Sequence, residues 1–365
     1  MTNKEKTIRT ACIYHRVDLD GWMSAAIVMH WFFEKVLATE VGVLSIEFIG
    51  YHYGDRIPDL SEYDKVIMCD ISFPKEEMFN LAKRLDVNFT WIDHHQPKIN
   101  EVSKYLVENK APTIDGLTTI EGRPKYAACE LTWQYFFPNE PIPEIVRLLG
   151  RYDCFGYKWL KSDEERRSIL IDYIKSNTRL MSQEEQNELK KLNKKHLEEQ
   201  KVLEFQYGAR SIISNYEEAY HWLMKCISEV VLEDNPSYNM SIIFQNTNKI
   251  WNTGKAIYKY LCTEAKQVYN NGFSISLTEP LYVNVDGVTV LKNWYIRNFL
   301  CVNKERFNPI NFGIDYHADG YDGVACFWYS NGKWQFSLYN DNGKVDCSLI
   351  AKDFGGGGHK VLLDL

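Results

Sequence analysis

The chain has 365 residues, a length typical of two domains, and its 45% hydrophobic and 25% charged residues are the balance of a soluble globular protein. The formal net charge of −7 argues against a basic surface for double-stranded DNA, so any nucleic acid would bind in a local pocket. Nine scattered cysteines without a CxxC pair favour reduced thiols over a disulfide framework or a zinc ribbon.

The N-terminal residues are polar, and no apolar signal core follows them. The longest apolar stretch, residues 22–37, is interrupted by Ser24, His30, Glu34 and Lys35, which favours a buried helix over a membrane span. We therefore expect a cytoplasmic protein with no membrane association.

Short β-rich runs alternate with helical stretches in the first part of the chain. Strands are expected at residues 11–15, 45–51, 65–69 and 88–92, and helices at 21–37, 74–85, 125–137 and 142–152. This alternation predicts an α/β domain with a parallel sheet and helices on both faces. Ligands bind such sheets at the carboxyl ends of the strands.

The composition changes after this domain. The Glu/Lys-rich run at residues 183–204 carries spaced leucines and balanced charges, which predicts a long, solvated connecting helix. Later strands are expected at 240–244, 281–285, 324–329 and 334–338, with a helix at 255–268 and a hairpin turn at 330–333. We therefore predict a catalytic domain over 1–160, a helical connector over 161–230, and a smaller α/β domain with a mixed sheet over 231–365.

A first candidate site, His15-Arg16-Val17-Asp18-Leu19-Asp20-Gly21, lies between a predicted strand and a predicted helix. Two carboxylates two residues apart, with a histidine before them, can surround a divalent cation, and Gly21 permits the sharp turn. The alternative is that the acids only cap the helix N-terminus. Arg16 and Ser24 lie close enough in sequence to contact a phosphate.

Three further blocks carry similar residues. Asp70 directly follows the strand at 65–69, and Asp93-His94-His95 follows the strand at 88–92. One of these imidazoles can bind a metal while the other faces the substrate, and Asp93 can fix a ring by a hydrogen bond. Asp153 ends a predicted helix, where a lone aspartate is usually structural.

Considered together, these residues favour a metal centre, because strand ends of one parallel sheet converge on one crevice. Oxygen and imidazole ligands without thiolates suit Mn²⁺ or Mg²⁺ better than structural zinc. Two such ions about 3.5–4 Å apart can clamp the attacking and leaving oxygens of a phosphoryl transfer.

The four blocks, in this order from His15 to Asp153, resemble the DHH phosphoesterases, whose signature triplet stands here as Asp93-His94-His95. The segment Lys352-Asp353-Phe354-Gly355-Gly356-Gly357-Gly358-His359-Lys360 resembles the glycine-rich block of the DHH-associated substrate domain. The family includes phosphodiesterases of nano-RNA, oligonucleotides and cyclic dinucleotides, single-strand DNA exonucleases and manganese pyrophosphatases.

The resemblance implies a role for each site residue. It implies one metal at His15, Asp18 and Asp70, and a second metal at Asp20, Asp70, His94 and Asp153. Asp70 would bridge the two ions, and His95 would contact the scissile phosphate.

The sequence departs from the family pattern in two places that matter here. The spacing from His15 to Asp18 is one residue shorter than in the His-x-x-x-Asp-x-Asp form of much of the family. An arginine often follows the Ser-Leu of the last strands, but here Ser337-Leu338 precedes Tyr339. Phosphate binding would then rely on the backbone amides of the glycine block, His359 and Lys360.

Several residues keep two interpretations. The glycine block binds phosphate or is a flexible tail, and Trp328, Tyr329, Trp334 and Tyr339 form a stacking platform for bases or belong to the core. His52 has no neighbours with metal-ligand spacing in the sequence, so no role is predicted for it.

We expect a phosphodiesterase that uses two Mn²⁺ ions, or Mg²⁺ as the alternative, on short single-stranded RNA or DNA. The alternative substrates are a cyclic dinucleotide, a bisphosphonucleoside or longer single-stranded DNA, and a catalytically silent nucleotide-binding module is the rival from another class. The sequence leaves open the natural substrate, the cleavage polarity and the oligomeric state, a homodimer included.

Overall fold

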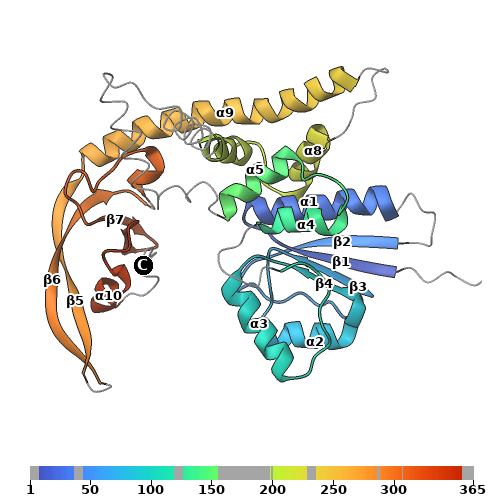
Figure 1. The fold of residues 1–365 in the computed structure, drawn as a ribbon, viewed down its shortest axis with the longest axis horizontal. Coiled ribbons are helices and arrows are strands. Elements are labelled where there is room, and N and C mark those ends of the chain that lie inside the picture. Colours follow the sequence, from blue (N-terminus) through green and yellow to red (C-terminus); the bar gives the residue numbers. More distant parts are fainter. Residues whose placement is uncertain are drawn as a thin grey trace, which may run out of the picture. The chain divides into compact units, whose positions relative to one another are not determined.

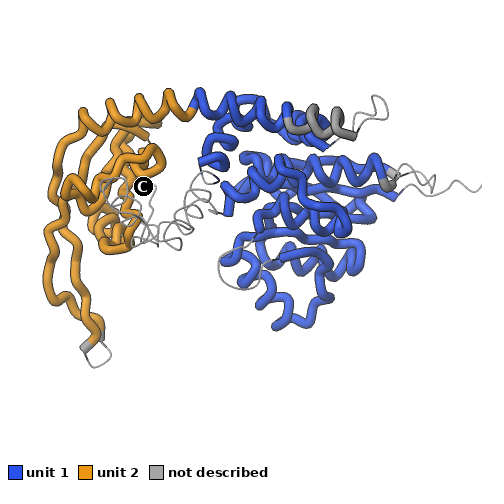
Figure 2. Tube along the Cα trace, turned by 45° about the horizontal axis from the view of Figure 1, so that its top comes forward, with its two compact units in different colours: residues 1–257 blue, residues 258–365 orange. Residues whose placement is uncertain are grey.

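The computed structural model describes residues 8–36, 44–118, 126–154, 198, 200–227, 236–285, 288–305 and 307–355. The chain divides into two compact units, Met1–Ile257 and Tyr258–Leu365, which Figure 2 shows in different colours. Each unit contains its own four-stranded sheet. Among the described helices, none has the length and apolar character that crossing a lipid bilayer requires.

The sheet of the first unit is parallel and has the strand order β2-β1-β3-β4 (Figure 1). Its strands are β1 (Ile8–His15), β2 (Leu44–Tyr51), β3 (Lys65–Cys69) and β4 (Phe89–Ile92). The central strands β1 and β3 are buried along most of their length, as near-continuous apolar runs covered on both faces should be. All four strands predicted from the sequence are confirmed.

Helices cover both faces of this sheet (Figure 1). On one face α1 (Leu19–Trp31) and α4 (Ala128–Phe136) pack against Cys12 and Ile67, and α5 (Glu144–Asp153) and α8 (Tyr216–Ile227) pack behind them. On the other face α2 (Lys75–Leu85) and α3 (Gln96–Glu108) pack against Ile13 and Met68. The predicted α/β architecture with two covered faces is confirmed.

The helix ends differ from the predictions by a few residues. α1 begins at Leu19, and its last predicted turns are a π-helical segment, Phe32–Val36. α2 begins after Pro74, which is its N-cap and not its first residue. The sequence did not predict α3, because this helix buries only Ile99 and Val102 and its apolar pattern is short.

Part of the predicted connector is described, and it is helical. Residues 200–210 form a helix whose Val202 and Phe205 are buried in the same core as α5 and α8. This helix meets α9 (Pro236–Asn270) at Gly208 and Gly254, and a Cβ at Gly254 would lie 1.7 Å from the Glu204 carbonyl oxygen. Glycine is therefore required for the two backbones to approach this closely. Residues 161–197, 199 and 228–230 of the proposed connector lie outside the described residues.

The strand predicted at residues 240–244 is wrong. These residues belong to α9, which also contains the predicted helix at 255–268. The run Met240-Ser241-Ile242-Ile243-Phe244 is apolar and β-branched, and such a short run does not distinguish a strand from a helix segment. Here the five residues are helical because they lie within the longer helix α9.

The second unit contains the mixed sheet β5-β6-β7-β8. Its strands are β5 (Phe273–Val285), β6 (Val288–Asn303), β7 (Gly323–Ser330) and β8 (Lys333–Tyr339), and only the β6–β7 pairing is parallel. One face packs on α10 (Cys347–Asp353) through Phe299. The other packs on the end of α9 and on the segment around η5 (Pro309–Phe312) through Leu300.

Details of this sheet test the remaining predictions. The hairpin turn is confirmed, because Ser330 pairs with Lys333 and the two residues between them have positive φ values. The predicted strands within β5, β7 and β8 are also confirmed, whereas β6 was not predicted.

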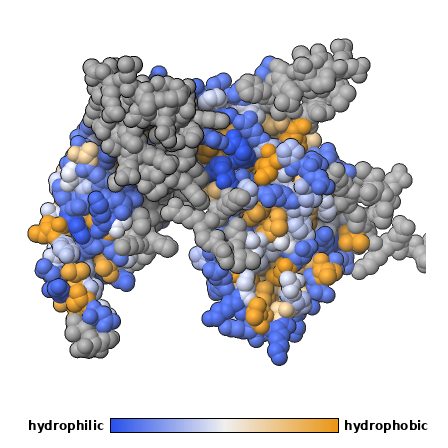
Figure 3. All heavy atoms as spheres, in the orientation of Figure 1, coloured by the Kyte–Doolittle hydropathy of each residue, from blue (hydrophilic) through white to orange (hydrophobic). Residues whose placement is uncertain are grey.

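The β5–β6 ribbon extends past β7, which pairs only with residues 299–303 of β6. Hydrophobic residues are visible on this ribbon, at the lower left of Figure 3, and its exposed apolar side chains include Leu291 and Ile296.

Candidate metal centre

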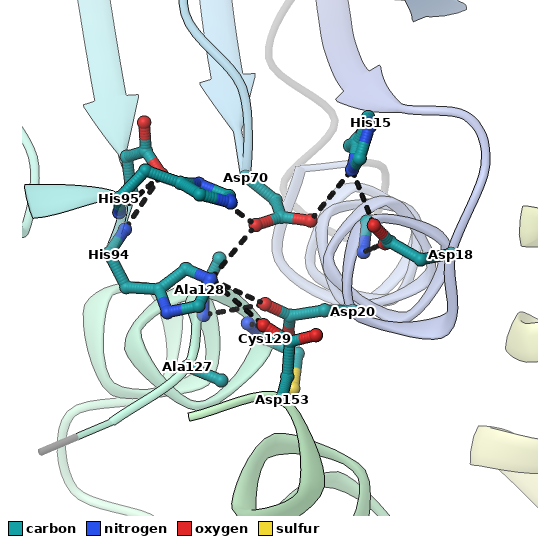
Figure 4. Close-up of polar contacts among 12 residues, drawn as sticks. His15, Asp18, Asp20, Asp70, His94, His95, Ala127, Ala128, Cys129 and Asp153 are labelled. Atoms are coloured by element: carbon teal, nitrogen blue, oxygen red, sulfur yellow. Dashed lines mark hydrogen bonds and ion pairs between the residues drawn. The ribbon is translucent and has the colours of Figure 1, made fainter. Parts of the chain in front are cut away.

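Aspartates and histidines meet at the carboxyl ends of three strands (Figure 4). His15 is the last residue of β1, Asp70 follows β3, and the Asp93-His94-His95 triplet follows β4. Helices supply the remaining members: Asp18 and Asp20 at the start of α1, and Asp153 at the end of α5. The structure therefore brings together every residue that the sequence analysis proposed as a metal ligand.

Asp70 lies in the middle of this group. Its Oδ2 is 3.5 Å from Nδ1 of His15, and its Oδ1 is 3.4 Å from Nε2 of His94 and 3.7 Å from Nδ1 of His95. The residue has a φ of 60°, a left-handed conformation that aspartate tolerates better than most residues. The turn after β3 thus directs the carboxylate into the cluster, with its two oxygens facing different neighbours.

One group of potential ligands consists of His15, Asp18 and Asp70, whose ligand atoms lie within 4.8 Å of one another. His15 Nδ1 is 2.5 Å from Asp18 Oδ2, so the short spacing between these residues still brings the ring to the cluster. Asp18 also caps α1 through Gly21 N, 2.9 Å away. Asp18 therefore caps the helix and belongs to the cluster at the same time.

Gly21 is required by the close approach of α1 to the end of β1. A Cβ at this position would lie 2.0 Å from the His15 carbonyl oxygen. Any side chain would push the helix away from the strand and separate Asp18 and Asp20 from His15.

A second group consists of Asp20, His94 and Asp153, again with ligand atoms within 4.8 Å. His94 Nε2 lies 3.4 Å from Asp20 Oδ2 and 3.0 Å from Asp153 Oδ2. Asp20 and His94 are buried, whereas the Asp153 side chain is 34% exposed, so the group is open to solvent on one side.

The N-terminus of α4 fixes Asp20. The two carboxylate oxygens of Asp20 accept hydrogen bonds from Ala128 N at 3.0 Å and from Cys129 N at 2.8 Å. Buried Glu130 accepts from Ala127 N and forms an ion pair with Arg151, two residues before Asp153. This pair connects the start of α4, which holds Asp20, to the end of α5, which carries Asp153.

Asp93 holds its two neighbours in place. It is fully buried, and its Oδ1 accepts from His94 N at 2.7 Å, from His95 N at 3.1 Å and from His95 Nδ1 at 2.7 Å. Burial raises the pKa of Asp93, but the hydrogen bonds and positive charge of His95 outweigh this effect and lower it. Nδ1 of His95 is thereby engaged by Asp93, and the His95 side chain is 37% exposed.

Burial and repulsion between carboxylates shift the protonation of the cluster. Burial raises the pKa of Asp20, and the charges of Asp70 and Asp153 raise it further. Burial lowers the pKa of His15, but its close contacts with the negatively charged carboxylates of Asp18 and Asp70 outweigh this effect and raise the pKa to about 10. The cluster attracts protons because its negative charges are close together, and a divalent cation binds such a site by displacing protons.

The residues present fit divalent cations. Both oxygens of Asp70 are buried, and neither accepts a well-formed hydrogen bond from a described residue. Buried carboxylate oxygens normally have such partners, so these two are available to ligate a cation. The oxygen and imidazole donors suit ions such as Mn²⁺ or Mg²⁺, and the described part of the cluster contains no thiolate.

Arg16, a candidate phosphate contact, pairs instead with Asp55, with Nε and Nη2 at 2.9 and 3.0 Å from its two oxygens. His52, for which the sequence predicted no role, lies against His15, with the two ring nitrogens 3.0 Å apart. The signal that could have identified His52 is its position directly after β2, a fourth strand of the same sheet.

The second unit holds the remaining candidates. Gly355 follows α10 with a φ of 76°, and residues 356–360 of the glycine block lie outside the described residues. Tyr339, which follows Ser337-Leu338, is buried in the core with Leu300 and Val324. It therefore belongs to the packing of the sheet.

Comparisons with known proteins agree with the location of the cluster. Residues 10–150 match the family described as DHH family, N-terminal domain. The uncharacterized protein R106 of Acanthamoeba polyphaga mimivirus is 26% identical over 158 residues, 42% of this chain and 35% of that protein. The chain thus spans about a third of that relative's length.

Among solved structures, an exopolyphosphatase-related protein from Bacteroides fragilis is similar at 10% identity and a TM-score of 0.33, over 97% of this chain and 85% of that one. A TM-score this low supports no conclusion about fold or function. The family match covers His15, Asp18, Asp20, Asp70 and the Asp93-His94-His95 triplet. The match to the DHH family, N-terminal domain, therefore includes all the clustered residues except Asp153, which lies just beyond it.

Proposed function

We propose that the chain is a phosphodiesterase that uses two divalent cations, Mn²⁺ or Mg²⁺, to hydrolyse short oligonucleotides or related nucleotides. The observation that carries this proposal is the position of Asp70, whose Oδ2 faces His15 and whose Oδ1 faces His94 and His95. A carboxylate shared by two cations would hold them at the short separation that two-metal hydrolysis uses.

The ligands divide between two positions. His15, Asp18 and Asp70 would hold one cation, and Asp20, Asp70, His94 and Asp153 would hold the other. Cations bound there would supply Lewis-acid stabilisation of the phosphate and a lowered pKa for water.

The protein's own groups then orient the substrate. Asp93 holds the ring of His95 through Nδ1, which would leave the opposite ring nitrogen for a substrate. From there His95 would donate a hydrogen bond to a nonbridging phosphate oxygen as negative charge develops on it.

A nucleotide substrate is supported by aromatic side chains on the second unit. Tyr329 and Trp334 pair across β7 and β8 with ring centroids 5.3 Å apart, and they are 63% and 58% exposed. Phe336 lies on the same face and is 47% exposed. Exposed rings of this kind stack on bases irrespective of sequence. Trp328 and Tyr339, in contrast, pack into the core on the opposite face.

The proposal is tested with the full-length protein freed of metal and then supplied with Mn²⁺ or Mg²⁺. The substrates are a panel of dinucleotides to decanucleotides, cyclic dinucleotides, a bisphosphonucleoside and a minimal chromogenic phosphodiester, with products resolved by length. We expect metal-dependent cleavage that is fastest on the short linear substrates. Metal binding without cleavage of any phosphodiester would refute the enzymatic proposal and favour a nucleotide-binding module.

Asp70→Asn is the sharpest variant, because asparagine tolerates the left-handed backbone and changes only the charge and one ligand atom. We expect it to lower turnover at least about a hundredfold, since one change weakens both metal positions. Asp59→Asn, at an exposed aspartate that accepts from Ser61 N, is the matched control and should retain full activity.

A further inference from the structure

The loop after β2 places a second histidine against the proposed metal centre. His52 Nδ1 lies 3.0 Å from His15 Nε2, and the two rings are stacked with centroids 5.3 Å apart and an interplanar angle of 20°. The contact joins residues that are 37 positions apart in the sequence. It lies on the side of the His15 ring opposite the nitrogen that faces the carboxylates.

This contact determines which nitrogen of His15 can bind a cation. Nδ1 of His15 faces Asp18 and Asp70, so its lone pair is available to an ion only when the ring proton is on Nε2. A hydrogen on Nε2 needs an acceptor, and His52 Nδ1 is in hydrogen-bonding position to be that acceptor. His52 would then carry its own proton on Nε2.

The rest of the loop fixes His52 in this position. Its backbone N–H donates to Asp55 Oδ2 at 2.9 Å, and Asp55 is also the partner of the Arg16 guanidinium. Arg16 N in turn donates to the Tyr51 carbonyl oxygen at 3.1 Å. The loops after β1 and β2 are therefore joined by both backbone and side chains.

We propose that His52 is a positioning residue that selects the Nδ1-ligating tautomer of His15 and fixes the orientation of its ring. The inference rests on the proposed two-metal function and assigns His52 to the cation held by His15, Asp18 and Asp70. Outer partners of ligating histidines typically contribute tenfold to a hundredfold to metal affinity.

Two variants separate the hydrogen bond from ring stacking. His52→Phe keeps a stacked ring but removes the acceptor, whereas His52→Asn removes the ring but can place Oδ1 where Nδ1 stood. Mn²⁺ binding to the metal-free full-length chain is followed by calorimetric titration. We expect His52→Phe to lower the affinity for one of the two Mn²⁺ ions by about tenfold to a hundredfold and to leave the affinity for the other unchanged. His52→Asn should retain most of the affinity that His52→Phe loses.

The controls make failure unambiguous. His221→Phe makes the same substitution at an exposed histidine of α8 and should bind Mn²⁺ like the wild type. Thermal unfolding of each variant in EDTA checks that the metal-free fold is intact. Unchanged Mn²⁺ affinity in His52→Phe, or equal loss at both ions, would overturn the role of His52 while leaving the two-metal proposal standing. A wild-type chain that binds no Mn²⁺ would overturn both.

Discussion

Gly21 and Asp70 show how single residues of the cluster meet conflicting demands. Gly21 leaves space for the end of β1 beneath α1, and Asp70 takes a left-handed backbone so that its carboxylate points inward. Residues held in less populated conformations are typical of functional sites, where the surrounding structure must stabilise them. The left-handed backbone of the turn after β3 thus orients the Asp70 carboxylate toward the cluster.

Gly21→Ala tests the close approach of α1 and β1. A Cβ 2.0 Å from the His15 carbonyl oxygen forces the helix to move, which we expect to cost about 2–4 kcal/mol of stability. Because Asp18 and Asp20 move with α1, Mn²⁺ affinity should fall as well. Thermal unfolding and Mn²⁺ titration measure the two effects, and wild-type values for both would show that the helix is not constrained there.

At the scale of elements, the parallel sheet explains why the cluster was predictable. Strands β1, β3 and β4 end at the same edge, so residues after each strand converge although they are far apart in the sequence. His52 was missed because only the pairing of β1 with β2 brings it next to His15, and the spacing of residues along the chain does not reveal that pairing. The prediction of a strand at 240–244 was wrong because five apolar residues do not reveal the long helix, α9, to which they belong.

Arg151→Met tests the connection between α4 and α5. The variant leaves the buried carboxylate of Glu130 without its guanidinium partner, and we expect a loss of about 2–4 kcal/mol, reduced from the usual range because Arg151 is partly exposed. The double variant Glu130→Gln/Arg151→Met removes both charges and should recover part of this loss, because glutamine can still accept from Ala127 N. Denaturant unfolding of these two variants and of Glu130→Gln decides the matter, and a loss in the double variant equal to the sum of the two single losses would show that the pair is not coupled.

At the scale of the whole molecule, the division into two sheets was largely predictable, whereas the details of the second unit were not. The mixed sheet was expected, but β6 was missed although it is the longest strand of the unit. Its alternating aromatic, charged and polar residues lack the apolar face that identifies a half-buried strand, since much of it lies in the exposed ribbon. Tyr329 and Trp334 were proposed as a platform together with Trp328 and Tyr339. Only the structure shows that Tyr329 and Trp334 lie on an exposed face, whereas Trp328 and Tyr339 pack against the core on the other face.

Trp334→Ala tests whether the aromatic face of the second unit binds bases. The proposed metal ligands all lie in the first unit, so Mn²⁺ binding and cleavage of a minimal phosphodiester should be unchanged. Stacking of one base is worth about 1–3 kcal/mol, so affinity for a short oligonucleotide should fall about fivefold to a hundredfold. An abasic oligonucleotide of equal length is the control, since its weaker binding should not respond to the substitution. Equal losses with both ligands would contradict stacking.

The central claim, that Asp70 bridges two cations, is tested most directly by the Mn²⁺ stoichiometry of four proteins. Calorimetric titration of the metal-free wild type should give two ions per chain. Asp18→Asn should lower the affinity for one ion and Asp153→Asn the affinity for the other, each by at least about tenfold. Asp70→Asn should lower the affinity for both ions. Asparagine at position 18 keeps the cap on α1, so its effect reports the lost ligand. A single ion in the wild type, or one ion bound at full affinity in Asp70→Asn, would contradict the bridging role.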